Sequence, residues 1–228
     1  MNAIFTMLLL RPYVFGFLIA FLFLASRLWG WRRTLLWLIL GYAISWGSEA
    51  LSIRTGFPYG WYFYKYENLT RDILVAGVPF WDSLSYTFLI FSGYTATQYA
   101  FPNLAFRWHA LIGATATMLL DIMIDPVSNL GDRWFLGSIY YYPSGGAHFG
   151  VPISNYLGWF FVAWIVILAA APTSSKIKNL NWFYPAFYLA IGIFNSAIAL
   201  WIGAFNIVAA NSAILAVCTL LFLRRGLK

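Results

Sequence analysis

Apolar residues fall in long runs along the chain, and polar residues gather in the stretches between them. A helix needs about 20 mostly apolar residues to cross a bilayer. Seven runs meet this length, at residues 4–26, 34–53, 78–99, 104–125, 152–171, 183–202 and 205–223. The pattern predicts an all-α fold, a polytopic membrane helix bundle of about seven transmembrane helices, with residues 1–228 forming a single integral membrane domain.

The composition agrees with a membrane protein. Of the 228 residues, 62% are hydrophobic and 9% are charged, whereas soluble domains carry about 25% charged residues. The single cysteine, Cys218, lies in the last run and has no partner for an internal disulfide. Arg11 precedes an apolar stretch, as in a signal peptide, but the run is long and its cleavage site poor, which favours an uncleaved first helix.

The net charge of +7 indicates membrane topology rather than nucleic-acid binding, because the basic residues lie where the apolar runs end. One side of the predicted bundle has Arg54, Lys65, Arg71 and Arg133. The other side is more basic, with Arg27, Arg32, Arg33, Arg107, Lys176, Lys178, Arg224, Arg225 and Lys228. The positive-inside rule then predicts an outside N-terminus and a cytoplasmic C-terminus, in a multi-pass protein of a prokaryotic cytoplasmic membrane.

Two long loops, residues 54–77 and 126–150, lie on the predicted outer side. Both are rich in aromatic residues and glycine, as in FPYGWYFYKY and SIYYYPSGG. Tyr and Trp favour the membrane interface, so most of these rings are predicted to form interfacial belts.

The two loops end in related sequences, GVPFWDSLSY at 77–86 and GVPISNYLGW at 150–159. Asp82 and Asn155 occupy matching offsets, and Glu49 and Asp121 lie at similar distances upstream. One interpretation is that the second and third spans are a parallel copy of the fourth and fifth. A chance match of three residues is the alternative.

The acidic residues divide into two groups. Glu67, Asp72 and Asp132 belong to loops and are predicted to be solvated. The other four lie within spans near their outer ends, at the same level as Asn155: Glu49, Asp82, Asp121 and Asp125. A charge at the centre of a bilayer helix costs about 2.5–3.5 kcal/mol, so such a group suggests a functional site.

The stretch LLDIMIDPVSN at 119–129 is the most informative. Asp121 and Asp125 are four residues apart and therefore share a helix face, although Asp125 could also simply end its helix before Pro126. Clustered carboxyl groups in a medium of low dielectric constant resist ionisation, so at least one is expected to be a neutral acid near pH 7. That acid could donate a proton to an apolar substrate.

Several functional classes fit poorly. Two histidines, His109 and His148, are too few for a membrane di-iron enzyme, and the last span has no lysine for a retinal Schiff base. The Asp-x-x-x-Asp spacing could bind a magnesium diphosphate as in prenyltransferases, but a second aspartate-rich cluster is missing. A non-enzymatic isoprenoid-binding, lipid-binding or proton-coupled transport protein stays an open alternative.

Several of these motifs together resemble the carotenoid biosynthesis membrane-protein family, which includes carotenoid 1,2-hydratases and an archaeal bisanhydrobacterioruberin hydratase. The resemblance covers residues 45–160, the expected catalytic core, and rests on Glu49, TGFPYGWYFY, both Gly-Val-Pro motifs, Asp121-x-x-x-Asp125-Pro126 and Trp134. Asp82 and the loop YYYPSGGAHFG depart from the family pattern, which leaves the substrate open.

The resemblance implies that water adds to a terminal trisubstituted alkene of a long isoprenoid or carotenoid, with no metal or other cofactor. Asp121 or Asp125 would protonate the alkene, and the other acid or Glu49 would orient water. Asn155 would support them, and Asp82 would be a fifth member of the group. Aromatic candidates to stabilise the cation are Trp46, Tyr59, Tyr62, Trp134 and Trp159.

Other partners expected from the resemblance are membrane lipid and neighbouring carotenoid-pathway enzymes, with no nucleic acid. If an internal alkene captured the cation instead of water, the protein would be a terpenoid cyclase or isomerase.

Overall fold

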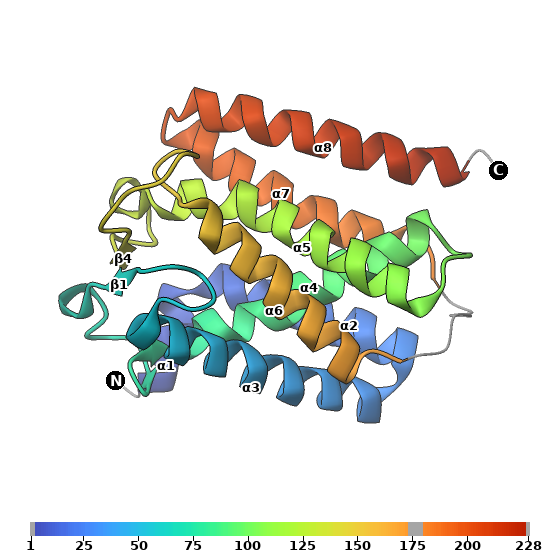
Figure 1. The fold of residues 1–228 in the computed structure, drawn as a ribbon, viewed down its shortest axis with the longest axis horizontal. Helices are drawn as coiled ribbons and strands as arrows, with labels where there is room; N and C mark the ends of the chain where they lie inside the picture. The colour runs from blue at the N-terminus through green and yellow to red at the C-terminus, as the bar shows by residue number, and fades with distance from the viewer. Residues whose placement is uncertain (1–2, 173–179, 227–228) are drawn as a thin grey trace.

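The computed structural model describes residues 3–172 and 180–226, and within these ranges the fold is all-α, as predicted (Figure 1). Its helices are α1 (Ala3–Leu10), α2 (Pro12–Trp29), α3 (Trp31–Thr55), α4 (Phe80–Ala100), α5 (Phe106–Ser128), α6 (Ile153–Ala170), α7 (Phe183–Trp201) and α8 (Phe205–Gly226). Two 3₁₀ turns span Tyr66–Asn68 and Gly131–Arg133. Four short strands complete the described part: β1 (Phe63–Tyr64), β2 (Leu74–Val75), β3 (Val78–Pro79) and β4 (Tyr140–Tyr141).

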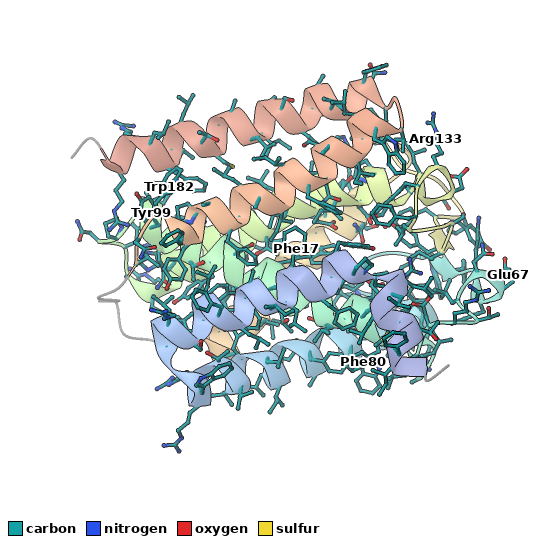
Figure 2. The ribbon with its side chains drawn as sticks, turned by 180° about the vertical axis from the view of Figure 1, so that it is seen from behind. Phe17, Glu67, Phe80, Tyr99, Arg133 and Trp182 are labelled. Atoms are coloured by element: carbon teal, nitrogen blue, oxygen red, sulfur yellow. The ribbon has the colours of Figure 1, made fainter. Side chains whose placement is uncertain are left out.

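The long helices lie side by side, and the two aromatic loops gather at one end of the bundle (Figure 1). Figure 2 shows Glu67 and Arg133 at this loop end and Tyr99 and Trp182 at the opposite end. The number of crossings and the orientation stay predictions, and Lys176, Lys178 and Lys228 lie outside the described residues.

Helix α4 is the centre of the bundle. It packs against α2, α3, α5, α6, α7 and α8, and most of its residues are buried. In the described ranges six helices are long and apolar enough to cross a membrane, and α4 is not among them. Its threonines and serines are buried except for the half-buried Ser85. This helix can therefore be polar while exposing few hydroxyl groups to hydrocarbon.

The predicted first span, 4–26, is wrong as a single helix. The chain breaks at Arg11, and Pro12 begins α2, where a missing backbone donor costs little. The Arg11 side chain is 4% exposed and forms an ion pair of 3.0 Å with Asp72. The prediction that Asp72 is solvated is therefore also wrong: its side chain is 1% exposed and also accepts a hydrogen bond of 2.7 Å from Trp81 Nε1.

Helix α5 does not end at Asp125. It continues to Ser128 with Pro126 inside its last turn, so α5 ends three residues beyond Asp125 even though Pro126 cannot donate a backbone hydrogen bond. Asp125 is therefore held rigidly on a helix face, one turn beyond Asp121.

The two loops are joined across the bundle end by an antiparallel pair of strands, β1 and β4, in which Tyr64 lies opposite Tyr140 and Phe63 opposite Tyr141. Gly56, in the left-handed conformation with φ 78°, ends α3 and turns the chain into the first loop. A side chain at Gly158 of α6 would lie 2.5 Å from the Tyr59 ring and 2.9 Å from the Pro58 carbonyl oxygen. The first loop thus packs directly onto the start of α6.

Candidate functional site

Asp121, Asp125 and Asn155 form one hydrogen-bonded group. Asn155, in the first turn of α6, donates from Nδ2 to Asp121 Oδ2 at 2.8 Å and to Asp125 Oδ2 at 2.9 Å. The exposed fractions are 2% for Asp121, 9% for Asp125 and 4% for Asn155. The sequence prediction that these three residues meet is confirmed.

Two tyrosines of the second loop complete the surroundings of Asp125. The Tyr140 hydroxyl donates to Oδ1 and the Tyr142 hydroxyl to Oδ2. Burial, and then the neighbouring Asp125 carboxylate, raises the pKa of both phenols well above the usual value. Both hydroxyls therefore keep their protons at neutral pH and act as hydrogen-bond donors.

Glu49 and Asp82 form a second acidic group around Tyr64 of the first loop. The Tyr64 hydroxyl is 2.8 Å from Asp82 Oδ2 and 3.3 Å from Glu49 Oε2, and Ser83 Oγ donates to Glu49 Oε2 at 3.2 Å. Burial raises the pKa of Tyr64 well above its usual value, so this phenol also remains a donor. Helices α3, α4 and α5 thus bring all four helical acids to the same end of the bundle, where α6 adds Asn155.

Two cavities meet at these acids. The first, which we call the apolar groove, has about 700 Å³ of space between atoms, part of it open to the outside. Mostly apolar side chains of α2, α4, α5, α6, α7 and the second loop line it, among them Tyr13, Phe17, Phe88, Trp134, Ile191 and Phe194. The second, which we call the tyrosine chamber, is smaller, with about 360 Å³ of space that is also partly open to the outside. Its lining includes Tyr59, Tyr62, Tyr64, Tyr86, Tyr140 and Tyr142.

The acids are distributed unequally between the cavities. Asp121 lines the groove but not the chamber, whereas Glu49 lines the chamber but not the groove. Asp82 and Asp125 line both, together with Tyr140 and Trp159. The acids therefore form the partition between an apolar space and a polar one.

Comparison with known proteins identifies the family. The model of a family described as carotenoid biosynthesis protein matches residues 7–224. The chain belongs to this family. Among curated proteins it is similar to the bisanhydrobacterioruberin hydratase of Haloarcula japonica, with 30% identity over 139 residues. That match covers 60% of this chain and 44% of the relative, so the chain spans less than half of that protein. No solved structure matches.

For this member of the carotenoid biosynthesis family, the structure places most of the aromatic residues predicted from sequence at the site. Tyr59 and Tyr62 line the chamber, Trp134 lines the groove, and Trp159 lines both. Trp159 stacks on Tyr86 with ring centroids 3.8 Å apart. Trp46 lines neither cavity: its indole donates to the Val75 carbonyl oxygen at the edge of the first loop.

Several site residues were not predicted from the sequence: three loop tyrosines, because most loop aromatics were assigned to interfacial belts, and two aromatic residues of the first predicted span. Tyr64, Tyr140 and Tyr142 instead face the acids, and Tyr13 and Phe17 of α2 line the groove. A signal was present in Tyr140-Tyr141-Tyr142, because alternate residues of an extended segment point to opposite sides. Over residues 3–172 and 180–226, no cluster of three or more His, Cys, Asp or Glu is arranged to hold a metal ion.

Proposed function

We propose that the protein is a carotenoid or isoprenoid hydratase that adds water to a terminal trisubstituted alkene by acid catalysis. The observation that carries this proposal is the position of the acids, between the apolar groove and the tyrosine chamber. The groove suits the end of a long hydrocarbon chain, and the chamber offers hydroxyl and carboxyl groups that can hold water. The family and its hydratase member support the same reaction class.

Hydrogen bonding supports Asp121 as the proton donor. Asp125 accepts bonds from Tyr140, Tyr142 and Asn155, and donors around a carboxyl group favour its ionised form. Asp121 accepts its bond from Asn155 and lines the groove, where an alkene would lie. In this proposal Asp121 is the protonated acid and faces the apolar substrate. Asp125 is the carboxylate and faces both cavities.

The proposed reaction begins when Asp121 gives its proton to the less substituted alkene carbon, which forms a new C–H bond and leaves a tertiary carbocation. A water molecule from the chamber then forms a C–O bond with the cationic carbon and loses a proton to a carboxylate at the partition. Asp82 and Asp125 line both cavities, so either can receive this proton and return it to Asp121. Protons and charge balance over the cycle.

Aromatic rings at the partition would stabilise the cation. Trp159 lines both cavities with its ring stacked on Tyr86, and Tyr140 lies beside the same acids. A cation over an aromatic face gains about 0.5–2 kcal/mol per ring. Tyr59 and Tyr62 would contribute from the chamber side.

The test is expression in cells that make acyclic and monocyclic carotenoids, with extracted pigments examined by liquid chromatography and mass spectrometry. We expect a pigment heavier by one water. Asp121→Asn should lower its formation by about 10²–10⁴-fold, the usual contribution of a general acid. Asp132→Asn is the matched control, because Asp132 is an exposed loop acid.

Other outcomes would contradict the proposal. An isomeric pigment would indicate a cyclase or isomerase that starts with the same protonation. Unchanged pigments with folded protein in the membrane would favour a non-enzymatic binding or transport role. Full activity of Asp121→Asn would remove this residue from the mechanism.

A further inference from the structure

The segment Tyr140-Tyr141-Tyr142 presents its side chains alternately. The hydroxyls of Tyr140 and Tyr142 reach the two oxygens of Asp125, whereas Tyr141 lies on the other side of the strand and is 44% exposed. Tyr141 contacts the Phe63 ring outside both cavities. Three identical residues therefore divide into two that touch the acid and one that does not.

We propose that Tyr140 and Tyr142 are positioning residues that hold Asp125 as a carboxylate and thereby leave the transferable proton on Asp121. This inference rests on the proposed hydratase function and adds roles for two residues of the second loop. Asn155 uses one amide nitrogen for both acids, so Asp125 Oδ2 receives donors from Asn155 and Tyr142 while Oδ1 receives Tyr140. Hydrogen bonds to the charged form of a carboxyl group stabilise that form.

The hydroxyls of Tyr140 and Tyr142 remain proton donors in these hydrogen bonds and do not become ionised themselves. Burial raises their pKa well above the usual value, and the adjacent carboxylate raises it further, so neither phenol loses its proton in the neutral range. The two hydroxyls therefore stabilise the charged form of Asp125 and not that of Asp121, although both aspartates share one helix face. Without such a pair, the proton could reside on either aspartate.

The strand pair extends this positioning to the other acids. Tyr140 lies opposite Tyr64 in the β1–β4 register, and Tyr64 donates to Asp82. The ionisable groups around Asp125 come from several elements: Asp121 on α5, Asp82 on α4, Glu49 on α3, Tyr156 on α6, and Tyr62 and Tyr64 in the first loop. Arg11, which is paired with Asp72, acts on Asp82. The pH dependence of activity therefore reports on the whole group, and only a comparison of variants isolates the two phenols.

The experiment compares Tyr140→Phe and Tyr142→Phe with Tyr141→Phe, which keeps the ring in every case and removes one hydroxyl. Turnover and KM are measured from pH 5 to pH 9 on purified protein with a carotenoid that the wild type hydrates. Loss of a hydrogen bond to a charged group should lower kcat by roughly 10–100-fold for each of the first two variants. KM should change little, and Tyr141→Phe should behave as wild type.

A second readout needs no substrate. Infrared spectra recorded against pH follow the protonated carboxyl band directly. We expect this band to persist to higher pH in Tyr140→Phe and Tyr142→Phe, because their carboxylate has lost a donor. In an Asp125→Asn background, adding Tyr140→Phe should have no further effect on either readout, since the partner acid is absent.

The two proposals fail in different ways. Wild-type kcat, pH profile and infrared titration in Tyr140→Phe and Tyr142→Phe would overturn the positioning role even if hydration is observed. If the wild type forms no hydrated product but the infrared shift appears, the hydratase proposal fails while the hold on Asp125 stands. An equal loss in Tyr141→Phe would show a general effect on the loop and would also overturn the positioning role.

Discussion

The two halves of the loop end, residues 49–82 and 121–155, are built from the same parts. Each has an acid near the end of a helix, a tyrosine in a short strand, a Gly-Val-Pro turn and a polar residue at the start of the next helix. In the first half these are Glu49, Tyr64 and Asp82, and in the second Asp121, Tyr140 and Asn155. The two tyrosines are direct partners in the β1–β4 register, so the two halves meet at this strand pair.

The halves differ in what lies between the acids. In the first, a phenol reaches both Glu49 and Asp82, and both acids line the tyrosine chamber. In the second, an amide joins Asp121 and Asp125, and Asp121 faces the apolar groove. The two halves thus differ in one acid each: Glu49 lines only the polar chamber and Asp121 only the apolar groove, whereas Asp82 and Asp125 line both. The proposed reaction between water and a hydrocarbon would use this difference.

The largest effect should come from the ion pair that joins Arg11, at the break between α1 and α2, to Asp72 of the first half. Arg11 binds Asp72 through two nitrogens and the Leu136 carbonyl oxygen through a third. Removing one partner of a buried pair leaves an uncompensated charge, so Arg11→Met should lower the free energy of unfolding by about 3–5 kcal/mol. The loss of stability is measured as a lower melting temperature in detergent. Arg107→Met, at an exposed position, is the control. Equal melting temperatures for the two variants would show that the pair does not support the loops.

The second effect tests whether the two halves are interchangeable. Asn155→Asp replaces the amide by a fifth acid, which cannot donate to Asp121 and Asp125 when ionised. Loss of two charge-assisted bonds should reduce hydration by about 100-fold. Asp82→Asn, the reciprocal change, keeps an acceptor for Tyr64 and should cost about tenfold or less. The amount of hydrated product is measured for both variants in the same host. Equal decreases in hydration would mean that the two halves are not specialised.

The smallest effect concerns the contact between the first loop and α6. A Cβ on Gly158 would meet the Tyr59 ring and the Pro58 backbone, whereas one on Gly47 would meet nothing within 4 Å. Overpacking typically costs about 1–3 kcal/mol, so Gly158→Ala should lower the melting temperature and disturb the chamber wall, while Gly47→Ala should not. Indistinguishable melting curves would show that the loop can move away from α6 without penalty.

The length of the apolar runs in the sequence predicted the helical fold, and the position of acids along the spans predicted the meeting of Asp121, Asp125 and Asn155. Both predictions depend on local properties, namely helix length and residue spacing. The Arg11–Asp72 pair joins residues 61 positions apart and could not be read from either. The tyrosine hydroxyls were missed for a similar reason: strand pairing between distant loops aims them at the acids, and composition alone suggests a lipid interface.

The buried polar surface of α4 has a consequence for biosynthesis. A segment must be sufficiently apolar to leave the translocation machinery and enter the lipid on its own, and α4 lacks the hydropathy of the six helices that qualify. Gly93 and Gly113 allow α4 and α5 to approach closely: a Cβ on Gly93 would lie 2.9 Å from the Gly113 carbonyl oxygen. We therefore expect α4 to be retained at the insertion site until α5 has been synthesised, so that the two helices enter the membrane together.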